Sequence, residues 1–105
     1  MSNQSVDHDR PRRQKELQAI NAVFKALDHP TRRQILMVMH FRGDAMNAGE
    51  IAERFSCRWP TVSRHMKILE HAGLVHVEKN GRERLYRVER NNLNIARSWF
   101  ASFDI

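Results

Sequence analysis

The segment that most constrains this chain is residues 56–73, which read SCRWPTVSRHMKILEHAG. Val62, Met66 and Leu69 recur at spacings of four and three, which predicts one apolar face on a helix. The other face carries short polar and cationic side chains: Thr61, Ser63, Arg64, His65 and Lys67. Such side chains read base edges and phosphates in the DNA major groove, although many solvated helix faces share this pattern. Gly73 follows where helices often end in a left-handed residue.

A predicted β-hairpin follows this helix. Residues 74–79 and 82–88 have strand character, and Asn80-Gly81 between them is typical of a type I′ turn, whose central residues both need positive φ. Four apolar residues are expected to face the core: Val75, Val77, Tyr86 and Val88. Three cations gather near the tip: Lys79, Arg82 and Arg84. They would either contact phosphates or only protect the hairpin edge from aggregation.

The composition favours a polyanionic partner. The chain has 105 residues, a formal charge of +6 and a pI of about 10.4, and fourteen of its eighteen cations are arginine. Arginine suits bidentate contacts with phosphate or guanine, and a pI above about 9 with clustered arginines is typical of nucleic-acid binders. The alternative is a basic surface that only aids solubility, and clustering of cations within 58–67 and 79–90 disfavours it.

The length predicts a single domain, which we assign to residues 10–105, after a polar tail at 1–9 that we expect to be disordered. The sequence contains no run of 18 apolar residues, and the start MSNQSVDHDRPRR lacks the apolar segment of a signal peptide. We therefore expect a cytoplasmic protein with no membrane partner.

Hydrophobic periodicity predicts a mainly α fold with a small β-hairpin, of the α+β class. The expected elements are helices at about 11–27, 30–41 and 48–55, the basic helix within 56–73, the hairpin, a helix at 90–103, and a short strand near 45–46 before the third helix. Asn47 and Glu50 fit a capping box at the start of the third helix. Either Asp28 or His29 would cap the second helix, which begins at Pro30. This order of elements is that of a winged helix-turn-helix.

Two arginines in the first turn of the second helix, Arg32 and Arg33, oppose the helix dipole. They are placed either for an external anion or as solvated or internally paired side chains.

The first and last helices are apolar on more than one side, so each needs more than one neighbour. A second copy of the chain is the simplest cover for the extra face, which predicts a two-fold dimer. The residues expected at this interface are Leu17, Ile20, Phe24, Ile95, Trp99, Phe100 and Phe103.

Several segments together resemble the arsenical-resistance-repressor (ArsR/SmtB) family of prokaryotic winged-helix repressors. The matching segments are FKALDHPTRRQIL, NAGEIAERF, PTVSRHMKILEHAGLV and GRERLYRV, which together cover roughly residues 22–88. The resemblance implies a homodimer paired through its first and last helices. It also implies an inverted-repeat operator and repression by occluding a promoter.

The chain departs from the family at its usual metal sites. Residues 50–53 offer no thiol, and the last helix has no histidine and a single carboxylate, Asp104. The chain therefore looks like the metal-independent branch, whose members often repress their own operons, and we expect no metal and no cofactor. Arg58 stands where the family usually has a capping serine, and Trp59 beside it packs locally or lies against the DNA backbone. Cys57, the one cysteine, is either a buried small residue or a redox-sensing thiol.

The prediction is a homodimeric, sequence-specific transcriptional repressor rather than an enzyme, because no catalytic arrangement of residues is recognisable. Thr61, Ser63, Arg64 and His65 would read bases. Phosphate contacts would come from Arg58, Lys67, Lys79, Arg82 and Arg84. The two recognition helices would lie about 34–36 Å apart, one turn of DNA. The alternatives are a winged helix that docks an acidic partner protein, and a thiol-responsive repressor that uses Cys57.

Overall fold

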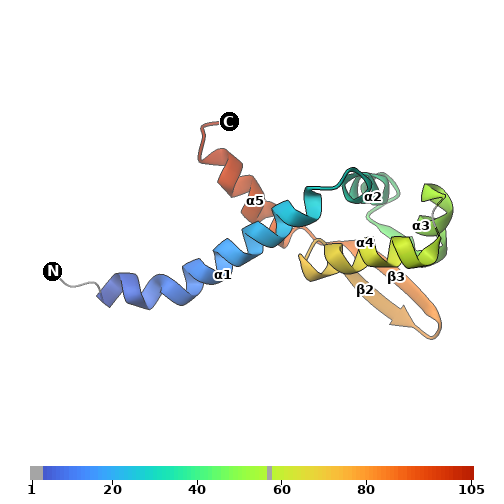
Figure 1. Ribbon diagram of the computed structural model, residues 1–105, viewed down its shortest axis with the longest axis horizontal. Helices are drawn as coiled ribbons and strands as arrows, with labels where there is room; N and C mark the ends of the chain where they lie inside the picture. Colours follow the sequence, from blue (N-terminus) through green and yellow to red (C-terminus); the bar gives the residue numbers. More distant parts are fainter. Residues whose placement is uncertain (1–3, 57) are drawn as a thin grey trace.

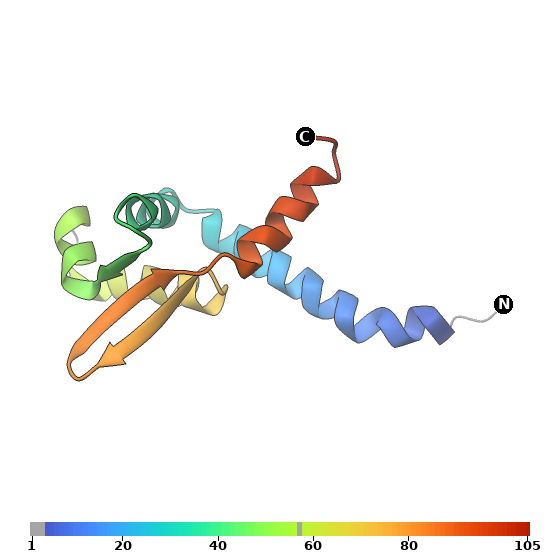
Figure 2. The ribbon, with the colours of Figure 1, turned by 180° about the vertical axis from the view of Figure 1, so that it is seen from behind.

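The computed structural model describes residues 4–56 and 58–105. Within these ranges the chain forms α1 (Gln4–Leu27), α2 (Pro30–Phe41), β1 (Ala45–Asn47), α3 (Ala48–Phe55), α4 (Trp59–His71), β2 (Val75–Asn80), β3 (Glu83–Val88) and α5 (Asn91–Ala101). We call α2 to β3 the winged body, and α1 with α5 the arm (Figure 1). In Figure 2 the β2–β3 hairpin extends away from the helices, and α5 crosses α1, against which it packs.

The first helix begins earlier than we predicted. We expected a disordered tail at 1–9 and a helix from about Pro11, whereas α1 already begins at Gln4. Residues 1–3 lie outside the described part of the chain, so disorder there stays a prediction, as does the assignment of residues 10–105 to one domain.

The starts of α2 and α3 follow the predicted capping. The His29 Nδ1 accepts a hydrogen bond of 3.2 Å from the Thr31 N–H, so His29 rather than Asp28 caps α2. At α3 the Glu50 N–H donates to the Asn47 side chain at 2.8 Å, and the Asn47 N–H donates to the Glu50 carboxylate at 3.0 Å. The capping box is therefore confirmed, and it fixes the first helix of the helix-turn-helix.

The end of α4 is fixed by a glycine. Gly73 has a φ of 73°, as predicted, and its N–H donates to the Glu70 carbonyl at 2.9 Å. A Cβ at this position would lie 2.4 Å from Nδ2 of Asn92, which donates to the Ala72 carbonyl at 2.9 Å. The left-handed turn thus joins the winged body to the start of α5.

The three-stranded sheet has the order β1-β3-β2, and both pairs are antiparallel. The short strand predicted near 45–46 is present as β1. The predicted turn type is wrong: Asn80 pairs with Glu83, so Gly81 and Arg82 form the turn. Gly81 has a φ of 64°, whereas Asn80 and Arg82 are not among the described residues with positive φ. A glycine alone at positive φ in the first central position fits a type II′ turn.

Most of the core lies in the winged body, between its helices and one face of the sheet, and Val23, Ala26 and Ala96 of the arm are buried in the same cluster. Ile35, Met39, Met46, Ile51 and Leu74 are each at most 1% exposed. Val75 and Tyr86 are buried, and Val77 and Val88 are half-buried and packed against the core, which confirms the predicted inward face of the hairpin. No helix among the described residues is long and apolar enough to cross a membrane.

Candidate nucleic-acid interface

The helix α4 has one anchored face and one open face. Val62, Met66 and Leu69 are at most 1% exposed and fix the helix on the core. The opposite side of the helix leaves Thr61, Arg64 and Lys67 exposed, as predicted. A side chain near the middle of an anchored, exposed helix is well placed to enter a groove of a nucleic acid, because its own fold does not cover it.

The start of α4 lacks the usual side-chain cap. Arg58 occupies the N-cap position, and its side chain makes no capping hydrogen bond. This is expected, because arginine has no side-chain oxygen that could accept a hydrogen bond from the first N–H groups of the helix. Arg58 is exposed, so its guanidinium is available at the end of the helix. Trp59 is half-buried and packs against the core, the local contact that was one of its two predicted roles.

His65, a predicted base reader, is directed toward the protein itself. Its Nδ1 lies 3.3 Å from Nη1 of Arg32, and its ring centroid lies 4.6 Å from that of His29. Burial, followed by the nearby His29 and Arg32, holds the pKa of His65 below its ordinary value. His65 is half-buried, unlike its neighbour Arg64.

A notch of about 200 Å³ lies between α4 and the wing. It brings together four of the predicted DNA-contacting residues: Ser63, Lys67, Lys79 and Arg84. Three cations around one small recess suit a phosphate group. The sequence did not place three further lining residues at this site: Glu70, Val77 and Tyr86. The spacing of three between Lys67 and Glu70 on one helix is the signal that could have found Glu70.

The wing carries both paired and unpaired charges. On its strands Arg87 donates to the Glu78 carboxylate at 2.9 Å. Lys79, Arg82 and Arg84 are exposed, and no hydrogen bond or ion pair to another described residue occupies them. The cations nearest the tip thus stay available to a partner.

The two arginines at the start of α2 are paired internally. Arg32 is 9% exposed, and its Nε and Nη2 donate to the carbonyls of Ala26 at 2.6 Å and Lys25 at 3.2 Å. Arg33 Nη1 donates to the Leu27 carbonyl at 2.7 Å. These carbonyls end α1 and carry the negative end of its dipole. Of the two roles we left open, internal pairing is therefore the one observed.

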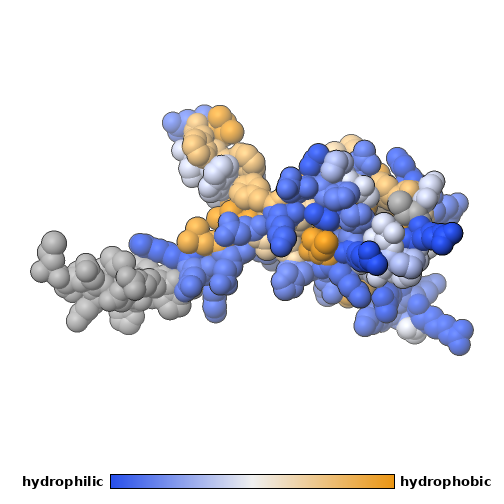
Figure 3. Space-filling model, in the orientation of Figure 1, coloured by the Kyte–Doolittle hydropathy of each residue, from blue (hydrophilic) through white to orange (hydrophobic). Residues whose placement is uncertain are grey.

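The arm exposes a cluster of aromatic side chains. The Phe24 ring lies 5.3 Å from that of Trp99 and 5.7 Å from that of Phe100, and Trp99 lies 5.1 Å from Phe103. Trp99 and Phe100 are nevertheless 44% and 46% exposed, and Leu17 on α1 is 59% exposed. In Figure 3 hydrophobic residues gather over α5 and its crossing with α1, whereas most of the visible winged body is hydrophilic. The predicted dimer residues Ile20 and Ile95 are half-buried.

Comparisons with known proteins agree with this architecture. A family model described as a helix-turn-helix domain matches residues 27–78. The transcriptional repressor SdpR of Bacillus subtilis (strain 168) is 36% identical over 84 residues, which are 80% of this chain and 91% of that protein. An ArsR-like transcriptional regulator from Rhodococcus sp. RHA1 is 30% identical, with a TM-score of 0.69 over 84% of this chain and 85% of that chain. The chain belongs to the ArsR/SmtB family.

A more distant solved structure shares the fold. It is a homodimeric winged helix-turn-helix DNA-binding domain from Mycobacterium bovis, 23% identical, with a TM-score of 0.68 over 89% of this chain and 85% of that chain. The relatives of this ArsR/SmtB protein are transcriptional regulators, which supports the expectation that it is not an enzyme.

The expectation that this ArsR/SmtB protein uses no metal stays a prediction. Over residues 4–56 and 58–105, no group of three or more His, Cys, Asp or Glu side chains is placed to hold a metal ion. Cys57 lies outside the described residues, so neither of its two predicted roles is tested.

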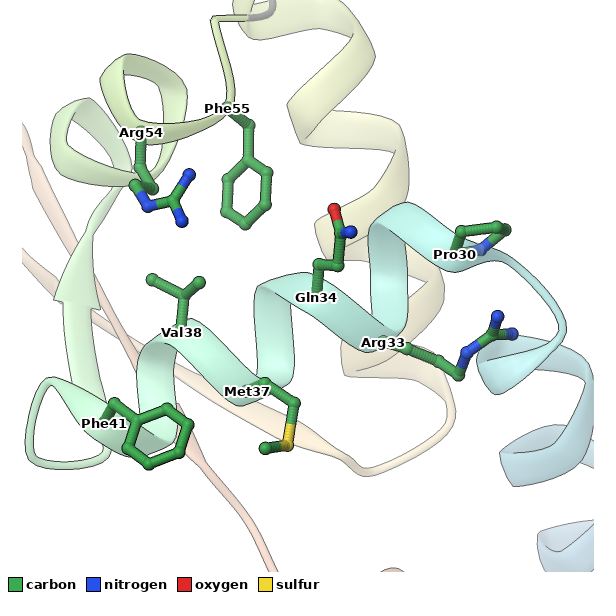
Figure 4. Close-up of a pocket in the computed structure, with 8 residues that line it drawn as sticks. All are labelled: Pro30, Arg33, Gln34, Met37, Val38, Phe41, Arg54 and Phe55. Carbon is green, nitrogen blue, oxygen red and sulfur yellow. The ribbon is translucent and has the colours of Figure 1, made fainter.

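A second hollow, of about 610 Å³, lies on α2 and the end of α3, and none of the predicted DNA-contacting side chains lines it. In Figure 4 Arg54 and Phe55 reach from α3 toward Val38 of α2, and the Arg54 guanidinium carbon lies 5.4 Å from the centre of the Phe55 ring. Phe41 on its rim is 77% exposed. This hollow combines apolar side chains with Arg33, Gln34 and Arg54, and it lies apart from the predicted DNA-contacting residues of α4 and the wing.

Proposed function

We propose that this ArsR/SmtB protein is a cytoplasmic homodimeric repressor that binds an inverted-repeat operator, including one upstream of its own operon. The observation that carries the proposal is the open face of α4, where exposed Arg64 and Thr61 stand beside a notch lined by Lys67, Lys79 and Arg84. A helix with such a face and a basic wing suits the major groove and the flanking phosphates.

The roles divide by position. Thr61, Ser63 and Arg64 would meet base edges, because they lie in the first half of α4. Phosphate contacts would come from Arg58, Lys67, Lys79, Arg82 and Arg84, which surround that half at the helix start, the notch and the wing tip. His65, which faces Arg32 and His29, is the predicted base reader with the least support.

The homodimer is supported by the aromatic surface of the arm. Trp99 and Phe100 contact each other on α5, and Leu17 lies on α1, against which α5 packs. All three side chains nevertheless stay about half exposed in one chain. Burial of such a surface by an identical surface related by a two-fold axis would remove apolar area from water. The absence of histidine on α5 supports regulation without the metal site that other family members build there.

The test is a gel shift with the DNA upstream of the chain's own gene, repeated over a range of salt concentrations. Arg64→Ala should weaken operator binding by about 1–3 kcal/mol and relax specificity, as expected for a bidentate base contact. Arg84→Ala should weaken binding to all sequences alike and flatten the salt dependence. Arg42→Ala is the matched control, because Arg42 is exposed in the turn after α2, away from α4 and the wing.

The outcomes separate the alternatives. Specific binding that Arg64→Ala abolishes supports the repressor. If Arg64→Ala binds both operator and random DNA as tightly as the wild type does, the base-reading role of Arg64 is contradicted. No DNA binding at any salt concentration would favour the protein-docking alternative, and a change in affinity after oxidation that Cys57→Ser removes would favour the thiol-responsive one.

A further inference from the structure

The buried side chain of Arg32 connects α1, a helix of the proposed dimer interface, to the recognition helix α4. Arg32 holds the last carbonyls of α1 through Nε and Nη2, and its Nη1 lies 3.3 Å from Nδ1 of His65 on α4. Arg32 thus links the end of α1 to the middle of α4, in addition to the direct packing of α1 on α4. The contact lies next to Arg64, the residue proposed to read a base.

The chemistry of this contact fixes the state of the imidazole. A guanidinium can only donate hydrogen bonds, so the Nδ1 of His65 must accept. An imidazole that accepts at Nδ1 is neutral and carries its proton on Nε2. Protonation of His65 would put a donor on Nδ1, opposite a donor on Arg32, and the contact would be lost.

The surroundings of His65 oppose its protonation. Arg32 of α2 brings a permanent positive charge, and the ring of His29, in the turn before α2, lies 4.6 Å away at a tilt of 58° and helps to cover the imidazole. His29 is itself fixed, because its Nδ1 caps α2 by accepting from the Thr31 N–H. The α1 helix contributes the carbonyls of Lys25 and Ala26, which Arg32 occupies. Burial acts in the same direction and is the first cause of the lowered pKa of His65.

We propose that Arg32 and His29 are positioning residues for the recognition helix, which they hold through neutral His65, so that specific DNA binding depends on the protonation state of His65. The inference rests on the proposed DNA-binding function. In the dimer, α1 sets the distance between the two copies of α4. Loss of the Arg32–His65 contact removes one of the ties between α4 and the end of α1. The recognition helix then shifts relative to α1, and the two copies of α4 no longer match one turn of DNA.

The sign of the pH effect follows from the geometry. Because the folded state favours neutral His65, the contact is complete near pH 7 and is lost as the pH falls below the lowered pKa. Specific affinity should then fall by up to about tenfold per pH unit for each protomer, the limit for one proton taken up by the free state. A histidine that simply contacted phosphate as a cation would give the opposite sign, because DNA would favour its protonation.

The first experiment needs no DNA. Long-range nitrogen–proton NMR spectra of the free protein should show His65 protonated on Nε2, with a titration midpoint below that of His71, which is exposed on the same helix. Arg32→Gln should raise the midpoint of His65, whereas Arg33→Gln should leave it unchanged, because Arg33 also holds an α1 carbonyl but does not contact His65. Arg32→Met, which also removes the charge and the donor, replaces Arg32→Gln if the latter does not fold.

The proposal is overturned if His65 carries its proton on Nδ1, or titrates like His71 in the wild type. It is also overturned if neither Arg32 variant moves the midpoint. Because these results concern the free protein, they stand whether or not the chain proves to bind an operator.

The second experiment measures the ratio of operator to random-DNA affinity between pH 7.5 and 5. The wild type should lose specificity on acidification, His65→Gln should show a flat profile, and His71→Gln should behave like the wild type. The same slope in the wild type and His65→Gln, or a ratio that rises on acidification, contradicts the proposal. Failure of all variants to bind any DNA would instead count against the proposed function.

Discussion

The winged body and the arm differ in how far they bury their large apolar side chains. In the winged body, helices from three directions and one face of the sheet cover the large side chains, so Ile35, Met39 and Leu69 are fully buried. In the arm, Val23, Ala26 and Ala96 join the same core, but Trp99 and Phe103 stay 44% and 62% exposed. The winged body thus buries its large core side chains within one chain, whereas in the proposed homodimer a second chain covers the exposed aromatic side chains of the arm.

This difference also separates the two tasks of the molecule. The winged body, with its buried core, presents α4 and the wing as one basic surface. In the proposed homodimer the arm sets where a second such surface stands. Polar bonds from Arg32, Asn92 and Arg90 join the two regions. They act together with Val23, Ala26 and Ala96 of the arm, which are buried in the same core as the winged body.

The largest expected effect is a cavity in the winged body. Leu69→Ala should lower the free energy of unfolding by roughly 2–5 kcal/mol, because Leu69 is fully buried on α4. Urea denaturation at fixed protein concentration measures this change. Met37→Ala, on the exposed side of α2, is the control and should change stability by less than about 0.5 kcal/mol. A loss of less than 1 kcal/mol for Leu69→Ala would mean that the body is not closed around this residue.

A charge in the arm should break the dimer and leave the body folded. Trp99→Asp should weaken dimerisation at least about thirtyfold, because removing a central aromatic side chain from an interface costs about 2 kcal/mol or more. Sedimentation equilibrium gives the constant, and circular dichroism reports the fold. Phe41→Asp is the matched control, since Phe41 is 77% exposed on α2, outside the arm. If the control weakens the dimer as much as Trp99→Asp does, the interface lies elsewhere.

The joint between the two regions can be probed with a pair of glycines. Gly73→Ala should cost about 1–2 kcal/mol for the left-handed backbone alone, and more because its Cβ would displace the Asn92 amide from the Ala72 carbonyl. Gly43→Ala has a similar φ of 84° but meets no atom within 4 Å, so it should cost only the backbone part. Equal losses of unfolding free energy for the two variants would show that the hydrogen bond from Asn92 to Ala72 does not contribute to stability.

The smallest expected effect is a pH dependence at the other polar link. Arg90, just before α5, donates to Asp44 at 2.8 Å, and this bond, followed by that from His40, lowers the pKa of Asp44 below its ordinary 3.8. Its contribution to stability is therefore complete above that ordinary value and is lost as the pH falls through the lower, folded-state pKa. The difference in unfolding free energy between wild type and Asp44→Asn should be small, constant near neutral pH, and vanish in strong acid. If this difference instead grows as the pH falls, the ionised Asp44 does not stabilise the folded state through Arg90, and the prediction is wrong.

Local patterns in the sequence were enough for most of this structure. The apolar spacing of α4, the capping box at Asn47 and the left-handed Gly73 each depend on a few neighbouring residues, and all three are confirmed. The direction of His65 could not be predicted in this way, because it depends on where the end of α1 meets α2 and α4. The hairpin turn failed for a related reason, since strand register, and not the Asn80-Gly81 pair, decides which residues turn.

The central claim is that two copies of the chain present α4 to successive grooves on one side of a duplex. A hydroxyl-radical footprint on the DNA upstream of the chain's own gene tests it most directly. We expect two protected half-sites on one face, with centres about 10–10.5 base pairs apart, that disappear together when Trp99→Asp replaces the wild type. A single protected patch that survives in Trp99→Asp would contradict the account.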